Sequence, residues 1–263
     1  MLTPEQIAHF ETFGYIVVRQ AFSPDEMTVI SAEFDDVLAE DRHGQAFDGE
    51  KRQAVLGFME RRPPLARLVE TDLIYEAMEQ LLGPGFTWVG SDGNLYVGDT
   101  SWHPDAGRPE YRFIKVAFYL DPVAKDTGAL RVIPGSHRPP LFNDLMVLHG
   151  KKGDVTPYGV AAREVPCVPL ESQPGDVVMF NQATWHASFG GKTGRRMFTL
   201  NFAAAPTLPE HEARLKEIYH GNLEYAKTHQ FTQTNRVYAE SFLHSASPRV
   251  QNMTAKLVEW GLE

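Results

Sequence analysis

The fold is decided by the stretch FTWVGSDGNLYVGDTSWHPDAG (86–107), in which two short apolar segments each end at a glycine. Segments of the same kind, rich in β-branched and aromatic residues, follow with Gly, Pro, Asp and Asn between them. They are FIKVAFYL (113–120), ALRVI (129–133), VVMF (177–180) and RRMFTLNFAA (195–204). Many short strands separated by turn residues are typical of a β-sandwich or barrel, such as a jelly roll. We therefore expect a jelly-roll core over 86–205.

Helix signals precede this region. The segments TPEQ (3–6) and SPDE (23–26) each combine a capping-box pattern with proline at the first helical position. Between the two helices that they predict, YIVVR (15–19) reads as a short β-branched strand. Apolar residues between 65 and 82 predict a further helix that stops at Gly83.

After Pro206 the pattern is helical again, and no internal repeat or low-complexity linker interrupts the chain. We therefore expect one domain over 1–263, mainly β with flanking helices. Its parts are a helical scaffold (1–85), a jelly-roll core (86–205) and C-terminal helices (206–263). One long stretch without clear periodicity, 138–164, is either a lid over a binding site or a plain surface excursion.

The composition limits the classes of partner. The 263 residues are 43% hydrophobic, enough for a sizeable core, and carry a formal net charge of −9. An acidic protein repels nucleic acids and anionic membranes, so a small molecule is the expected partner. The single cysteine, Cys167, excludes an internal disulfide and a thiolate zinc cluster. Neither a signal-peptide pattern nor a membrane-length apolar run is found, and we expect a cytoplasmic protein.

A histidine and an aspartate two positions apart, His103 and Asp105, follow a predicted strand. Residues i and i+2 of a strand point to the same face, so both side chains can reach one ion. The similar triplet His9-Phe10-Glu11 lies in a predicted helix, where i and i+2 diverge by about 200°. Two histidines and one carboxylate with open coordination positions are the signature of non-haem Fe(II) oxygenases. The pair is therefore a candidate for two of three iron ligands.

The third ligand must come from a distant strand, and the best candidate is His186 in PGDVVMFNQATWHAS (174–188). The alternative is a core histidine that donates to a carbonyl. The following strand, GRRMFTLNF (194–202), begins with Arg195 and Arg196, of which strand alternation lets only one face inward. An inward guanidinium needs an anion, because an unpaired buried charge is very costly. A dicarboxylate cosubstrate would supply one through a bidentate pair.

Four motifs follow one another along the chain. They are WHPD (102–105), GALRVIPGSHR (128–138), PGDVVMF…WHAS (174–188) and GRRMFTLNF (194–202). In this order they resemble the phytanoyl-CoA dioxygenase family of non-haem Fe(II)/2-oxoglutarate-dependent oxygenases, over about residues 4–203. Each motif is weak alone, and the four in register make the match specific.

The resemblance implies a double-stranded β-helix (jelly roll, cupin-like) wrapped by helices. It implies that His103, Asp105 and His186 bind Fe(II), with 2-oxoglutarate and O2 as cosubstrates. By position, Arg195 corresponds to the arginine that holds the far carboxylate of 2-oxoglutarate, and Arg196 remains the alternative.

Further residues are candidates for contacts to the cosubstrate. Ser188 resembles a hydrogen-bonding position of relatives, or is a strand-end serine bonded to the backbone. Asn94 and Tyr96 share one face of the strand before the motif. Lys115 either faces inward, where it needs a carboxylate of cosubstrate or substrate, or is a solvated edge residue, which we favour. Trp102 either walls the site or only packs.

The resemblance therefore implies an oxidoreductase that hydroxylates, or otherwise oxidises, a small organic metabolite or natural-product intermediate, with release of succinate and CO2. Because Asp105 is retained, the sequence reads against halogenation. Two alternatives remain, namely a cupin-like metal-dependent isomerase or hydrolase, and a non-catalytic binding protein of the same fold. The inward arginine disfavours the former and the intact triad the latter. Substrate and oligomeric state have no readable motif.

Overall fold

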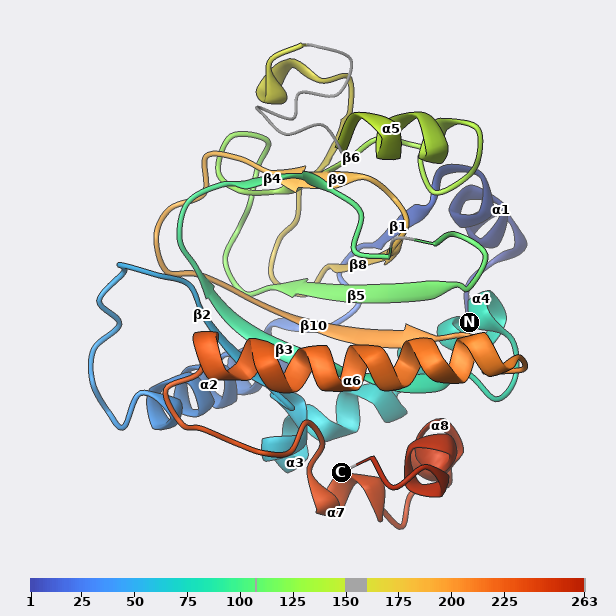
Figure 1. Cartoon of the computed structure of the whole chain (residues 1–263). Coiled ribbons are helices and arrows are strands. Elements are labelled where there is room, and N and C mark those ends of the chain that lie inside the picture. The colour runs from blue at the N-terminus through green and yellow to red at the C-terminus, as the bar shows by residue number, and fades with distance from the viewer. Residues whose placement is uncertain (107, 150–159, 263) are drawn as a thin grey trace.

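Two antiparallel sheets pack face to face in the part of the chain that a computed structural model describes, residues 1–106, 108–149 and 160–262 (Figure 1). The larger sheet has the order β1-β8-β5-β10-β3-β2, and the smaller sheet has the order β4-β9-β6-β7. The strands are β1 (Tyr15–Val18), β2 (Gln53–Leu56), β3 (Thr87–Tyr96), β4 (Thr100–His103), β5 (Phe113–Tyr119), β6 (Leu130–Val132), β7 (Val168–Leu170), β8 (Val177–Asn181), β9 (His186–Ser188) and β10 (Arg195–Ala203). The predicted jelly-roll fold is confirmed, although β1 and β2 of the larger sheet come from the region 1–85, which we expected to be a helical scaffold.

Side-chain alternation in the central strands separates the barrel interior from its outer face. Ala117 and Tyr119 of β5 and Met197 of β10 point between the sheets, where they pack with residues of β6 and β7. The intervening residues, such as Val116 and Phe198, face the other way into the main apolar core. Any side chain in step with Ala117 or Met197 therefore lies inside the barrel.

Helices cover the outer face of the larger sheet (Figure 1). Phe34 of α2, Met78 of α4 and Met253 of α8 belong to the same buried cluster as Phe198 of β10. The helices are α1 (Pro4–Phe13), α2 (Pro24–Asp41), α3 (Pro63–Ala66), α4 (Asp72–Leu82), α5 (Leu141–His149), α6 (Pro209–His229), α7 (Glu240–Leu243) and α8 (Pro248–Glu259), with 3-10 turns η1 (Met59–Arg61), η2 (Arg67–Glu70) and η4 (Ala162–Glu164). No helix among the described residues is long and apolar enough to cross a bilayer.

The local helix signals are confirmed. The hydroxyls of Thr3 and Ser23 accept from the backbone three residues on, and the side chains of Gln6 and Glu26 accept in return from the cap backbone. The first helix ends at Gly14, which adopts the left-handed conformation at φ 83°. Each of these interactions lies within one helical turn, so neighbouring sequence alone is enough to specify it.

The expected helix over 65–82 is wrong in one respect, because this segment is divided into α3, η2 and α4. The break falls at Thr71, whose extended backbone and hydroxyl cap the start of α4. The two segments predicted before and after Ser91 form one continuous strand, β3, with a register shift near its start. Strands β2, β4 and β7 were not among the predicted segments; each spans only three or four residues.

The stretch 138–164, which shows no periodicity in sequence, begins with helix α5. Phe142 and Leu145 of this helix are buried against Trp102 and Trp185, on the outer side of the smaller sheet. Residues 150–159 lie outside the described residues, and the lid remains a prediction.

A buried carboxyl group joins two segments of the helical layer to β3. Glu60 of η1 is 7% exposed, and one of its oxygens accepts from the indole Nε1 of Trp88 at 3.0 Å. The other oxygen accepts from the backbone N–H of Ala239, before α7. Burial raises the pKa of Glu60 to about 7, although both hydrogen bonds and Arg61 act in the opposite direction.

This pKa predicts a pH-dependent stability. A glutamate of the unfolded chain titrates near 4.5, so between about pH 4.5 and about pH 7 the folded protein binds more protons than the unfolded chain. The free energy of unfolding should therefore fall as pH rises through this window, by about 3 kcal/mol from this group. In Glu60→Gln this pH-dependent part of the free energy of unfolding should disappear. In Glu50→Gln, which changes an exposed glutamate, it should remain. The free energy of unfolding is measured by denaturation at several pH values. If it had the same pH dependence in the wild type and in Glu60→Gln, the prediction would be wrong.

Candidate active site

Two paired strands of the smaller sheet place the predicted ligands side by side. In the ladder between β4 and β9, His103 lies directly opposite His186. Strand β4 ends at His103, and the backbone N–H groups of Asp105 and Ala106 both donate to the carbonyl of Gln182, at 2.8 and 3.0 Å. This turn after Pro104 directs the Asp105 carboxylate towards the two imidazoles.

The three side chains form one compact cluster. The Nε2 atom of His103 lies 3.5 Å from Oδ1 of Asp105, and the Nε2 atom of His186 lies 3.6 Å from Oδ2. One donor atom from each residue lies within 4.8 Å of the other two. Two imidazole nitrogens and a carboxylate oxygen at these separations can bind one divalent transition-metal ion.

Backbone carbonyls orient both imidazole rings. The Nδ1 atom of His103 lies 2.7 Å from the carbonyl oxygen of Ser101, and that of His186 lies 2.8 Å from the oxygen of Thr184. A carbonyl oxygen only accepts, so Nδ1 carries the proton in each neutral ring and the Nε2 lone pair points at the cluster. A second hydrogen bond of this kind is the usual support of a metal-binding histidine.

The charge states of the cluster suit cation binding. Burial opposes charge on Asp105, but Lys115 and both imidazoles outweigh it and hold the pKa of this carboxyl well below its usual range. Burial lowers the pKa of His186 to about 4, which keeps the ring neutral near pH 7. Burial acts in the same direction on His103, yet the neighbouring carboxylate raises its pKa, so a metal ion here would compete with a proton.

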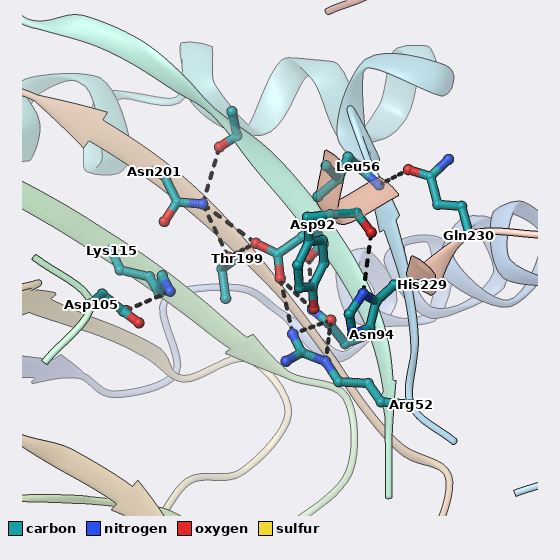
Figure 2. A network of polar contacts seen from close by, with 12 residues as sticks. Arg52, Leu56, Asp92, Asn94, Asp105, Lys115, Thr199, Asn201, His229 and Gln230 are labelled. Atoms are coloured by element: carbon teal, nitrogen blue, oxygen red, sulfur yellow. Dashed lines mark hydrogen bonds and ion pairs between the residues drawn. The ribbon is translucent and has the colours of Figure 1, made fainter. Parts of the chain in front are cut away.

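Lys115 does not occupy the solvated position that we favoured from the sequence. Its Nζ atom lies 2.6 Å from Oδ2 of Asp105, as Figure 2 shows, and its side chain lines the barrel interior. The reason is alternation, because Lys115 is in step with Ala117 and Tyr119, which point inward. The carboxylate that it contacts belongs to the chain itself.

The two adjacent arginines of β10 point in opposite directions. Arg195 is 2% exposed and lines the same cavity, of about 120 Å³, as the three-residue cluster. Among the described residues, neither Nε nor Nη1 of Arg195 has a hydrogen-bond partner. Arg196 points outward, where it pairs with Asp121 at 2.9 Å and Asp35 at 2.8 Å. Arg195 is thus the one of the pair that is placed to receive an anion.

Two glycines make room for the Arg195 guanidinium. A Cβ atom added at Gly128 would lie 2.0 Å from Nη1 of Arg195, and one added at Gly191 would lie 1.6 Å from the same atom. Both distances are far shorter than a van der Waals contact. The ring of Tyr96 lies 5.0 Å from the guanidinium carbon and provides a cation–π contact. The buried guanidinium therefore packs against an aromatic ring and glycine backbone. Its Nε and Nη1 hydrogens have no acceptor among the described residues.

The remaining candidates have different surroundings. Ser188 lines the smaller cavity, and its hydroxyl donates to the carbonyl of Gly128 at 2.9 Å. Asn94 is fully buried, and its Oδ1 accepts from the Nε of Arg52 at 3.0 Å. It is not among the described residues that line either cavity near the cluster. Trp102 packs in the outer cluster and donates from Nε1 to the carbonyl of Ala162 at 2.8 Å, so it does not wall the site.

A larger cavity, of about 320 Å³, adjoins the smaller one. The two share Arg52, Asp92, Asp105 and Lys115. Arg52 was not predicted as a site residue, because it precedes the short, unpredicted strand β2. Asp92 was detectable, since it stands two residues before Asn94 and four before Tyr96 on the same face of β3.

The jelly roll and the cluster at its interior define a non-haem iron oxygenase of the 2-oxoglutarate-dependent class. The model of one family, described as Phytanoyl-CoA dioxygenase (PhyH), matches residues 10–198. The chain belongs to this family.

Individual relatives are distant. The chain is 25% identical to the ectoine dioxygenase of Sphingopyxis alaskensis over 228 residues, which cover 73% of this chain and 72% of that protein. It is 26% identical to the ectoine dioxygenase of Bordetella bronchiseptica over 52% of this chain and half of that protein. The crystal structure of EctD from S. alaskensis with bound Fe is similar in fold, with a TM-score of 0.59, 23% identity and 77% of each chain covered.

Proposed function

We propose that the protein uses Fe(II), 2-oxoglutarate and O2 to hydroxylate, or otherwise oxidise, a small organic metabolite or natural-product intermediate, with release of succinate and CO2. His103, Asp105 and His186 hold the iron, and Arg195 binds the far carboxylate of 2-oxoglutarate. The observation that carries the proposal is a buried guanidinium with free polar hydrogens in the same cavity as the three-residue cluster. The ectoine dioxygenases among the relatives support a small polar substrate.

The donor set fits a ferrous ion. Neighbouring donors of an octahedral site lie about 3 Å apart, because metal–ligand distances are about 2.1 Å. The two separations to Asp105, 3.5 and 3.6 Å, need only a small contraction to reach this value. Three protein ligands leave the remaining positions to face the cavity, where cosubstrate and O2 can bind.

Bound Fe(II) and 2-oxoglutarate supply the oxidising chemistry, in which the cosubstrate is decarboxylated to succinate and one oxygen atom is delivered to the substrate. The contribution of the chain is geometric. The carbonyls of Ser101 and Thr184 fix the two imidazoles, and Arg195 sets the direction of the cosubstrate. Leu130 and Phe180 add apolar surface to the otherwise polar wall of the smaller cavity.

We also propose that residues 1–263 act as one oxygenase domain. The larger cavity supports this, because strands of the core and helix α6 wall it together. A cupin-like isomerase or hydrolase would not require an anion receptor at Arg195, and a binding protein would not require a complete set of metal donors.

One assay tests the proposed function. Anaerobic addition of Fe(II) and 2-oxoglutarate to the purified protein should produce a weak visible charge-transfer band, and admission of O2 should then yield succinate. An isomerase or hydrolase that does not use 2-oxoglutarate would show neither, and a non-catalytic binding protein would yield no succinate. Absence of both band and succinate would refute the oxygenase assignment, and compounds that accelerate succinate formation would identify the substrate.

A further inference from the structure

The larger cavity is the place next to the cluster where a substrate can bind, and the inference that follows rests on the proposed function. Asp105 and Lys115 separate this cavity from the smaller one. Its volume of about 320 Å³ lies at the lower end of the range for small-molecule sites, about 300–1,000 Å³. The substrate that it fits is therefore small.

One wall of this cavity is a face of helix α6. Arg214, Ile218, Asn222 and Tyr225 follow one another at intervals of four, four and three residues, the spacing of one helix face, and all line the cavity. The helix lies beyond the residues that the family model matches, 10–198. This wall, with its amide and phenol groups, offers hydrogen bonds to the polar body of a substrate.

Most charged groups of the cavity already have partners. The guanidinium of Arg52 donates to Asn94 and lies over the ring of Tyr96, 4.0 Å from its centroid. Asp92 accepts from Thr199 and Asn94, as Figure 2 shows. Arg214, at the outer end, pairs with Glu217 at 2.6 Å.

Lys115 differs from these groups. The one carboxylate within salt-bridge distance of its Nζ, among the described residues, is that of Asp105. In the proposed function this carboxylate also binds the metal and shares its negative charge with a divalent cation. The ammonium group of Lys115 then lies beside the divalent cation and has no carboxylate of its own to balance its charge. This arrangement is costly in a partly buried site.

In the site with Fe(II) and 2-oxoglutarate bound, the positive and negative charges do not balance. The difference gives the sign of the charge that the substrate must carry. The positive groups are Arg52, Lys115, Arg195 and a ferrous ion, which together carry five charges. The negative groups are Asp92, Asp105 and the two carboxylates of 2-oxoglutarate, which carry four. One positive charge stays uncompensated until the substrate binds.

We propose that Lys115 receives the negatively charged group of the substrate, and that the substrate is a small polar molecule with a single carboxylate. The carboxylate bonds to Nζ beside the metal site, and the polar face of α6 contacts the rest of the molecule. This assigns to Lys115 a role in substrate selection that is separate from the binding of 2-oxoglutarate by Arg195.

The test uses the protein loaded anaerobically with Fe(II) and 2-oxoglutarate, so that Arg195 and the metal are already occupied. Acetate, propionate and benzoate are titrated while melting temperature and the visible band are followed, with the corresponding primary amides as uncharged probes. We expect saturable stabilisation by the carboxylates, an unchanged band, and affinities about tenfold weaker for the amides. Equal effects of carboxylates and amides, or no saturable carboxylate binding, would overturn the proposal. Failure of the band to form at all would instead refute the proposed function.

Matched variants assign the effect to the lysine. Lys115→Met should keep the band but bind the carboxylates about tenfold more weakly, and Lys115→Arg should retain most of the affinity. Lys125→Met, which removes an exposed lysine elsewhere, should behave as wild type. Loss of the band in Lys115→Met would show that Lys115 mainly holds Asp105 in place, and this would overturn the proposal.

Discussion

Replacing His103 with alanine should abolish tight Fe(II) binding and lower succinate formation by about a thousandfold or more. Removal of a residue that only orients a metal ligand already costs about 10- to 100-fold, and removal of a ligand should cost more. The variant should still fold, because the His103 side chain is about one-third exposed and leaves no sealed cavity. Metal affinity is measured by anaerobic Fe(II) titration, and folding by the melting temperature of the metal-free protein.

The chain provides its own control for this experiment. His9 belongs to the other His-x-acid triplet, which lies in α1. His9→Ala should therefore keep the metal affinity and turnover of the wild type. If His103→Ala bound Fe(II) as tightly as the wild type and retained turnover, the assignment of the triad would be wrong.

Arg195→Met should weaken 2-oxoglutarate binding by about 100-fold or more. A bidentate guanidinium–carboxylate pair contributes two charge-assisted hydrogen bonds, and the variant loses both. The same variant should raise the stability of the ligand-free protein by about 1–3 kcal/mol, because it removes a buried charge whose Nε and Nη1 lack partners among the described residues. Weaker binding of 2-oxoglutarate together with higher stability of the ligand-free protein is specific to a buried cation whose counterion is the bound ligand.

The neighbouring arginine is the matched control. Arg196→Met removes a part-buried ion pair to Asp121 and a more exposed one to Asp35, both outside the cavity, so it should slightly destabilise the protein and leave 2-oxoglutarate affinity unchanged. Equilibrium binding of 2-oxoglutarate and denaturation of the ligand-free protein measure both quantities. Loss of affinity in Arg196→Met alone would reverse the assignment.

Local sequence was sufficient wherever the deciding interaction spans a few residues. The capping boxes at Thr3 and Ser23 and the end of the first helix at Gly14 are hydrogen bonds within single turns. The turn that directs Asp105 towards the imidazoles is different, because the backbone N–H groups of Asp105 and Ala106 donate to the carbonyl of Gln182, in a segment far along the chain. Short segments rich in β-branched and aromatic residues, separated by turn residues, predicted the jelly roll, because both signals are read from neighbouring residues.

The sequence by itself determined most of the strands and the helix caps and made His103 and Asp105 a candidate pair of ligands, and strand alternation showed that Arg195 and Arg196 face opposite sides of one strand. It did not determine which side is the interior. In β10 the apolar residues Phe198, Leu200 and Phe202 share a face with Arg196, and this face packs under the helices. Only the tertiary structure decided that the more polar face, with Arg195, lines the cavity, and that Lys115 meets Asp105 there. Alternation fixes which residues share a face, whereas the layers packed on each face are set by contacts between segments far apart in the chain.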